Sequence, residues 1–180
     1  MRLPSKSLET RVSSITYVSM MPYSGWMVRE IDAALIARVT EAARESPRRR
    51  MNFNFHTGAG DNPHRFLNVM LRGTYVQPHR HLNPPKAEAF LALSGQGCVV
   101  TFDDAGAVVS RHFIGDGCAA LGVDIGAGVW HTVVVLSEVL VCYEVKPGPW
   151  DPATDKEFAE WAPAEGSGEV DGYVSGILEA

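Results

Sequence analysis

From residue 66 to residue 146, short runs of β-prone residues alternate with turns rich in glycine and aspartate. The predicted strands cover residues 66–72, 74–77, 88–93, 98–102, 108–114, 119–124, 130–136 and 139–146. Many short strands at such intervals are typical of a sandwich or barrel of the jelly-roll type. No strand alternates with a long helix in this stretch, which disfavours a parallel α/β sheet. We therefore predict an all-β fold.

An amphipathic pattern before these strands predicts one α-helix. Its apolar positions recur at helical spacing, opposite a charged face, and are Ile31, Leu35, Ile36, Val39 and Ala43. The helix should end near Ser46, because Pro47 disfavours helical geometry in the residue before it. We expect the basic run at residues 48–50 to complement the helix dipole rather than to bind a polyanion.

A length of 180 residues suits one domain with a core of useful size. The predicted divisions of the chain are an N-terminal extension over residues 1–26, a single domain with its helix over residues 27–166, and a loose tail over residues 167–180. Trp150, Phe158 and Trp161 are expected to anchor the last part of the domain on the strands.

Charge and cysteine content narrow the class of protein. A net charge of −5 argues against nucleic acid as a partner, because phosphate binding needs a clustered basic face. No apolar run approaches the roughly 18 to 20 residues that span a bilayer, and no secretory signal is visible, so we expect no membrane association. Cys98, Cys118 and Cys142 are odd in number and form no C-x-x-C pair. They indicate reduced thiols, buried in strands of a cytoplasmic protein.

Four residues have the chemistry and spacing of a metal site. His79 and His81 are two apart, so on an extended strand both imidazoles point to the same side. Glu88 begins the next predicted strand, and His131 opens a later one. Antiparallel strands can bring all four side chains to one barrel mouth. Imidazole and carboxylate ligands suit one divalent ion of iron, manganese, nickel or zinc.

The residues around these ligands resemble a known motif. The spacing of five residues resembles the first motif of the cupin superfamily. That motif reads glycine, five residues, His-x-His, a gap, glutamate, six residues and glycine, and the matching residues here are Gly73, His79, His81, Glu88 and Gly95. The gap before Glu88 holds six residues where the family usually has three or four. In the second motif, residues 126–131, glycine replaces the usual proline, and the ligand histidine is kept as His131. The resemblance implies an all-β cupin jelly-roll β-barrel with an N-terminal α-helix and a bound metal.

A narrower resemblance covers about residues 27–166. Residues 78–81, residues 84–86 and the segment 146–166 are similar to the WbuC-type cupin-fold metalloproteins. This resemblance implies a bacterial protein from a surface-polysaccharide (O-antigen) setting. By the same analogy we expect a homodimer.

Other polar residues near the motif have two interpretations each. Lys86 shares strand parity with Glu88 and can bind an anionic substrate group or take part in catalysis, or it is a solvated lysine. His56 can serve as an acid or base, or it is a surface loop histidine. Tyr75 can line the substrate site or fill the core. Glu88 itself can bind the metal or orient a ligand histidine.

The sequence supports more than one function for such a site. The first hypothesis is a metalloenzyme acting on a small polar molecule, such as a sugar or sugar acid, as an isomerase, epimerase or oxygenase. The alternative is a non-catalytic, metal-dependent module for ligand binding or regulation, since cupin barrels serve both roles. A structural ion that only stabilises the barrel is a third possibility. The sequence does not choose among these.

Overall fold

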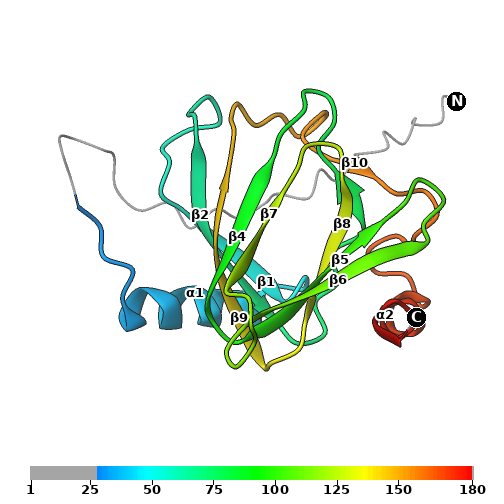
Figure 1. Cartoon of the computed structure of the whole chain (residues 1–180). Coiled ribbons are helices and arrows are strands. Elements are labelled where there is room, and N and C mark those ends of the chain that lie inside the picture. The colour runs from blue at the N-terminus through cyan, green and yellow to red at the C-terminus, as the bar shows by residue number, and fades with distance from the viewer. Residues whose placement is uncertain (1–27, 180) are drawn as a thin grey trace, which may run out of the picture.

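The computed structural model describes residues 28–179, and the extension expected over residues 1–26 lies outside them. Two five-stranded sheets form a barrel (Figure 1), and every pairing between named strands is antiparallel. The first sheet has the order β1 (Arg50–Asn54), β2 (His64–Leu71), β9 (Val139–Lys146), β4 (Glu88–Ser94) and β7 (Gly122–Ile125). The second has the order β10 (Glu157–Phe158), β3 (His79–Arg80), β8 (Trp130–Val135), β5 (Gln96–Phe102) and β6 (Val108–Gly115). The predicted all-β jelly roll with an N-terminal helix is confirmed.

The core between the sheets follows from strand alternation. Alternate residues of each strand face the interior and form an apolar cluster of Met70, Phe90, Val99, Ile114, Ile125, Val133, Val135, Leu140 and Cys142. The same strands carry polar side chains on this inner face farther along, at Asn68 in β2 and at Glu144 and Lys146 in β9. The interior is therefore apolar in one part and polar in another.

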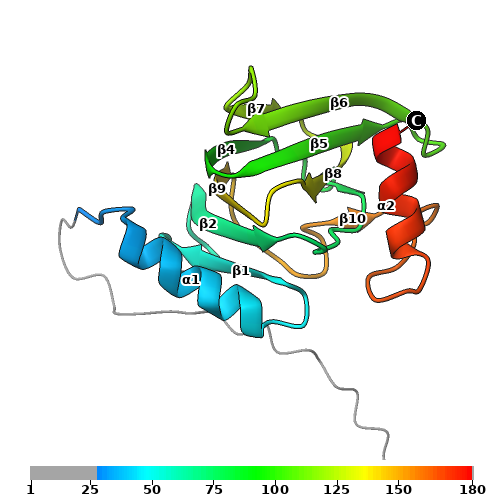
Figure 2. The same cartoon turned by 90° about the horizontal axis from the view of Figure 1, so that it is seen from below.

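Helix α1 (Ala33–Glu45) covers the outer face of the first sheet, as Figure 2 shows. Asp32 caps its N-terminus by accepting a hydrogen bond of 2.8 Å from the Leu35 amide. Leu35, Val39 and Ala43 are buried against the sheet, together with neighbours such as Leu67. The helix ends before Ser46 and Pro47, as the sequence predicts.

The segment expected to be a loose tail instead contains helix α2 (Val170–Glu179), which packs on the second sheet (Figure 2). Ile177 is buried among residues of the outer face of that sheet, including Val100 and Val134. The apolar pattern of α2 is short and carries two glycines, so its helical period is weak without the sheet beside it. Neither α1 nor α2, the helices of the described residues, has the length and apolar character needed to cross a bilayer.

Part of the region before α2 anchors the chain as predicted. The Trp161 ring lies 5.0 Å from Phe102 and 5.8 Å from Trp130, measured between ring centroids. Phe158, in contrast, stays half exposed, with its ring 6.1 Å from the ring of His79. Phe158 is thus not a core anchor and lies instead beside a predicted metal ligand.

Two strand predictions are wrong in their limits. Residues 74–77 do not form a strand, and β3 is only His79–Arg80. Residues 50–54, which lie outside the predicted strands, form β1, where Asn52 faces Asn68 of β2. Inward side chains of β1 meet the polar part of the barrel, so the strand lacks the apolar alternation by which strands are recognised.

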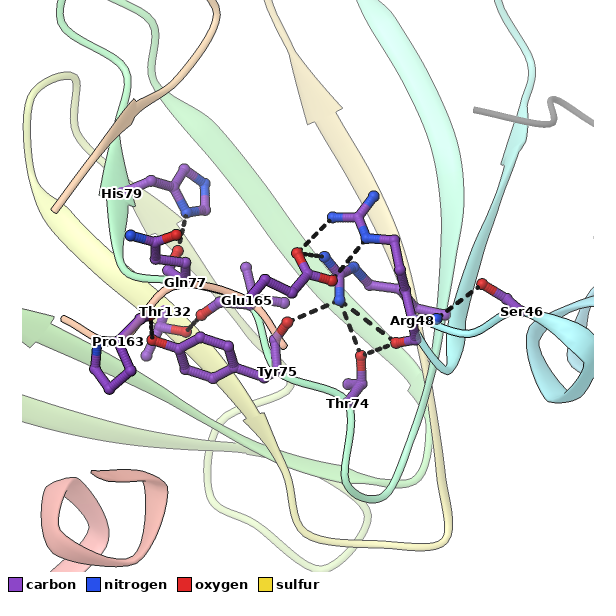
Figure 3. Close-up of polar contacts among 11 residues, drawn as sticks. Ser46, Arg48, Thr74, Tyr75, Gln77, His79, Thr132, Pro163 and Glu165 are labelled. Atoms are coloured by element: carbon purple, nitrogen blue, oxygen red, sulfur yellow. Dashed lines mark hydrogen bonds and ion pairs between the residues drawn. The ribbon is translucent and has the colours of Figure 1, made fainter. Parts of the chain in front are cut away.

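The basic run after α1 has a different role from the one expected. Arg48 donates to the Glu165 carboxylate at 2.8 Å and 3.1 Å, as Figure 3 shows. Arg50 donates to Glu165 at 2.9 Å, to the Thr74 hydroxyl at 3.2 Å and to the Tyr75 carbonyl at 2.8 Å. Arg48, just before β1, and Arg50, in β1, therefore join this part of the chain to the segment that follows the barrel.

The two motif glycines have conformations that favour glycine. Gly73 and Gly95 have φ angles of 81° and 79°. A Cβ at Gly95 would lie 2.0 Å from the carbonyl oxygen of Val139. The turn between β4 and β5 therefore requires glycine for both torsional and steric reasons.

Candidate metal centre

The structure brings together the four predicted metal ligands. His79 in β3 pairs directly with His131 in β8, His81 follows β3, and Glu88 opens β4 of the opposite sheet. All four side chains are buried, and one ligand atom from each lies within 4.8 Å of the others. The lengthened gap before Glu88 does not displace it, because Glu88 is the first residue of its strand. The site thus spans both sheets of the barrel.

Backbone carbonyls set the tautomer of each histidine. The Nδ1 atom of His79 lies 3.0 Å from the Gln77 carbonyl oxygen, and that of His131 lies 2.9 Å from the Val129 oxygen. Nδ1 of His81 contacts the carbonyl oxygen of Asp155 in the same way. Because a carbonyl oxygen can only accept, each Nδ1 carries the proton and each Nε2 has a free lone pair. This is the arrangement of metal-binding histidines.

The free ring atoms converge on Glu88. Its Oε1 atom lies 2.6 Å from Nε2 of His131 and 3.3 Å from Nε2 of His81. All three atoms are buried, and none of them has a partner in hydrogen-bonding geometry among the described residues. Buried polar atoms without partners are costly. A cation between them would satisfy all three, so the donor set fits a metal ion.

The charge state of His79 agrees with this interpretation. Burial lowers the pKa of His79 well below its ordinary value, and the positive charge of Lys156 lowers it further. His79 is therefore neutral at neutral pH, which is the form that binds a metal.

Lys86, predicted to bind substrate or act in catalysis, is buried behind the ligands. Its ammonium group donates to the Asp155 carboxylate at 2.7 Å and to the Pro149 carbonyl at 2.6 Å. Asp155 also accepts from Lys146 at 3.2 Å. Because the carbonyl of the same Asp155 orients His81, the ion pair with Lys86 fixes the segment that holds a ligand. Lys86 is thus neither solvated nor free for a substrate.

The other two sequence candidates have contacts elsewhere. His56 stacks on His64, with ring centroids 4.0 Å apart, and its Nδ1 lies 3.1 Å from the Arg65 carbonyl oxygen. The Tyr75 hydroxyl donates to the Pro163 carbonyl at 2.8 Å (Figure 3), and its ring contacts Tyr173 of α2. These contacts support structural roles. Among the described residues, no contact joins either side chain to the four ligands.

Three charged residues near the ligands escape sequence reasoning. Glu144 and Lys146 are buried on the inner face of β9, and Lys156 lies just before β10. Burial raises the pKa of Glu144 to about 8, with the charge of Glu88 as the next cause. Strand parity could have indicated the first two, since they continue the inward positions of Leu140 and Cys142. Lys156 has no such signal, because β10 is only two residues long.

Comparisons with known proteins agree with this fold. Residues 31–114, just under half of the chain, match the model of a domain of unknown function, DUF6016. A sequence comparison with curated proteins found no match. A crystal structure of CapF with the inhibitor 3-isopropenyl-tropolone superposes with a TM-score of 0.53 and 23% identity over 64% of this chain. The capsular polysaccharide assembling protein CapF from Staphylococcus aureus, in another crystal form, gives a TM-score of 0.50 and 23% identity over 62% of this chain.

The two matches to CapF cover only part of that protein. This chain spans about a third of the CapF chains, 33% and 31% of their lengths. At this identity the similarity concerns the fold alone, and that fold is a jelly roll of the cupin type. The fold and the four buried residues agree with the cupin-type site that the sequence predicts, and these residues could hold one metal ion.

Proposed function

We propose that the protein is a metal-dependent enzyme acting on a small polar molecule, with one divalent ion held by His79, His81, Glu88 and His131. The observation that carries the proposal is the set of three buried imidazoles, each donating its Nδ1 proton to a carbonyl. Their Nε2 atoms and a glutamate oxygen meet at one point inside the barrel. Nothing in a purely structural polar cluster requires that shared tautomer.

The donor set indicates which ions and which chemistry suit the site. Three imidazoles and one carboxylate suit ions of iron, manganese, nickel or zinc. When bound, such an ion supplies Lewis acidity for a carbonyl or hydroxyl group, and a redox-active iron also supplies oxygen chemistry. These ions accept up to six ligands, so four protein ligands leave room for a substrate atom.

The residues around the ligands have separate tasks. The carbonyls of Gln77, Val129 and Asp155 hold the rings in place and fix where each proton resides. Glu88 supplies the negative charge that offsets part of the charge of the ion. The burial of all four ligands keeps bulk water from competing for them.

The finer proposals concern substrate and setting. A sugar or a sugar acid, transformed by isomerisation, epimerisation or oxygenation, suits a Lewis-acid site that binds adjacent oxygen atoms. CapF, which shares the fold, is described as a capsular polysaccharide assembling protein, and this supports a role in surface polysaccharide (O-antigen) biosynthesis. A WbuC-type bacterial cupin working in the cytoplasm as a homodimer is part of the same proposal.

The test is a ligand and turnover screen on protein loaded separately with Fe(II), Mn(II), Ni(II) and Zn(II). Sugars, sugar acids and nucleotide sugars serve as substrates, and product is followed by NMR. Tropolone, which carries two adjacent oxygens, serves as a competitor for the open metal positions. We expect turnover that requires metal, is inhibited by tropolone and is abolished in His131→Ala. Saturable binding without turnover would contradict the enzymatic proposal and identify a ligand-binding module instead.

A further inference from the structure

Lys156 lies on the same inner face as the metal ligands. Strand β10 pairs antiparallel with β3, and Phe158 is directly opposite His79. Continuing this register by two residues places Lys156 opposite His81. Facing residues of antiparallel strands have side chains on the same side, and so do residues two apart. Lys156 therefore belongs to the row that carries Phe158 and the two ligand histidines.

Electrostatic interactions with residues of the barrel interior agree with this placement of Lys156. Its positive charge is the strongest of the charges that lower the pKa of His79. Burial lowers the pKa of Lys156 itself to about 8, and Lys146 lowers it further, while Glu88 and Glu144 oppose this shift. These interactions agree with the inward position that the β-strand register gives for Lys156.

Lys156 differs from the other lysines of this interior in having no ion-pair partner. Lys86 and Lys146 share the Asp155 carboxylate, at 2.7 Å and 3.2 Å. Among residues 28–179, no carboxylate oxygen lies within 4.0 Å of the Lys156 ammonium, although Glu88 and Glu144 act on it from farther away. An inward ammonium without a counterion is costly, so its charge is available for a ligand.

The overall charge of the interior favours an anionic ligand. Lysines and carboxylates balance in number, with Lys86, Lys146 and Lys156 against Glu88, Glu144 and Asp155. A divalent ion at the four ligands would add two more positive charges. An anion is the ligand that offsets them.

Asn68, on the inner face of β2, offers a second recognition group. Its amide nitrogen donates to Glu144 at 3.0 Å, which orients the side chain. Its carbonyl oxygen Oδ1 is buried and has no hydrogen-bond donor among the described residues. A hydroxyl group of a ligand is a donor that would satisfy this atom.

We propose that Lys156 and Asn68 recognise the substrate of the metal centre, and that the substrate is a small hydroxy carboxylate. Its carboxylate would bind the ion and Lys156 together, and a hydroxyl would donate to Asn68 Oδ1. The inference rests on the proposed metal site and names the substrate class for it.

The experiment measures binding by calorimetry to full-length protein loaded with Co(II), using small probes that differ in one group. The probes are glycolate, its neutral isostere glycolamide, acetate without the hydroxyl, and inorganic phosphate. We expect glycolate to bind the parent protein at least about tenfold more tightly than glycolamide or acetate. Lys156→Met should weaken glycolate binding by about 10- to 100-fold, the loss expected for a charge-assisted hydrogen bond, with little effect on glycolamide.

Matched variants separate recognition from structure. Lys156→Arg keeps the charge and should retain most of the glycolate affinity, and Arg38→Met removes an exposed charge on α1 and should change nothing. Asn68→Leu should remove the preference for glycolate over acetate. The Co(II) affinity of Lys156→Met should stay within about threefold of the parent value, which a misfolded variant would not show.

Each contrary outcome has its own meaning. Unchanged glycolate affinity in Lys156→Met, with Co(II) bound normally, would overturn this inference and leave the metal site intact. Tighter binding of phosphate than of glycolate would overturn the carboxylate class. A parent protein that does not bind Co(II) would overturn the proposed function, and the present inference with it.

Discussion

Asp155 is the residue whose replacement should expose how the site is held. Its buried carboxylate neutralises Lys86 at 2.7 Å and Lys146 at 3.2 Å, and its carbonyl orients His81. Asp155→Asn keeps the shape but leaves the buried Lys86 ammonium without an anion, and it leaves Lys146 with only the Glu144 carboxylate, 3.8 Å away. Removing one partner of a buried ion pair costs about 3–5 kcal/mol. The amide oxygen of the variant can still accept a hydrogen bond, so we expect the lower end, about 3 kcal/mol.

Differential scanning calorimetry on metal-free protein measures this loss. For a chain of this length each kcal/mol lowers Tm by about 2–4 °C, so Asp155→Asn should lower Tm by roughly 6–12 °C. The matched control is Glu157→Gln, which removes the carboxylate of a neighbouring, half-exposed ion pair with Arg80. An exposed pair contributes about 0–1 kcal/mol, so that Tm should change by less than about 4 °C.

A double-mutant cycle and a pH series test the reasoning itself. Lys86→Met combined with Asp155→Asn should show coupling of at least about 1 kcal/mol. Burial would raise the pKa of Asp155, but Lys146 and Lys86 outweigh burial and lower it. The stabilisation is therefore complete above the ordinary aspartate pKa of about 3.9 and is lost as pH falls below it. Equal Tm values for parent and Asp155→Asn at pH 7 would refute this account.

Three further predictions concern other parts of the chain. Trp161→Ala should lower the free energy of unfolding, measured in urea, by roughly 2–3 kcal/mol, and should let a protease cut between the barrel and α2. An unchanged free energy of unfolding would mean that the Trp161 ring does not anchor this segment. Burial raises the pKa of the Cys142 thiol to about 12 and also raises the pKa of the Cys98 thiol. Iodoacetamide at pH 8 should therefore modify only the partly exposed Cys118, and intact-mass spectrometry should show a single adduct. Burial lowers the pKa of His79 in the folded protein, so near pH 6 only the unfolded state binds a proton at this residue. The metal-free protein should therefore lose stability as pH falls below about 6.5. The same dependence of the unfolding free energy on pH in the parent and in His79→Gln would contradict this.

The metal ligands are predictable because they depend mostly on local rules. His79 and His81 share a face through strand parity, and Gly73 and Gly95 have φ angles that the flanking turns require. Those constraints act over a few residues, so the sequence pattern is sufficient to recognise them. The convergence with Glu88 and with His131 requires the whole barrel, and there the motif supplied the expectation.

The surroundings of the ligands are not predictable in the same way. The sequence predicts that Lys86 can bind a substrate because it gives no sign of the partner Asp155, which lies far along the chain. Helix α2 has a short apolar pattern and is stabilised by the sheet it covers. Lys156 comes next to the site only through pairing of a two-residue strand with β3. In each case the deciding contact is tertiary, and no local pattern encodes it.

The central claim is that three imidazoles and Glu88 share one divalent ion, and metal stoichiometry tests it most directly. Protein purified without chelators or affinity metals, then analysed by plasma mass spectrometry, should contain about one divalent ion per chain. His79→Ala and His131→Ala should lose at least about 90% of that metal while remaining folded by circular dichroism. Near-stoichiometric metal retained in both variants would contradict the account.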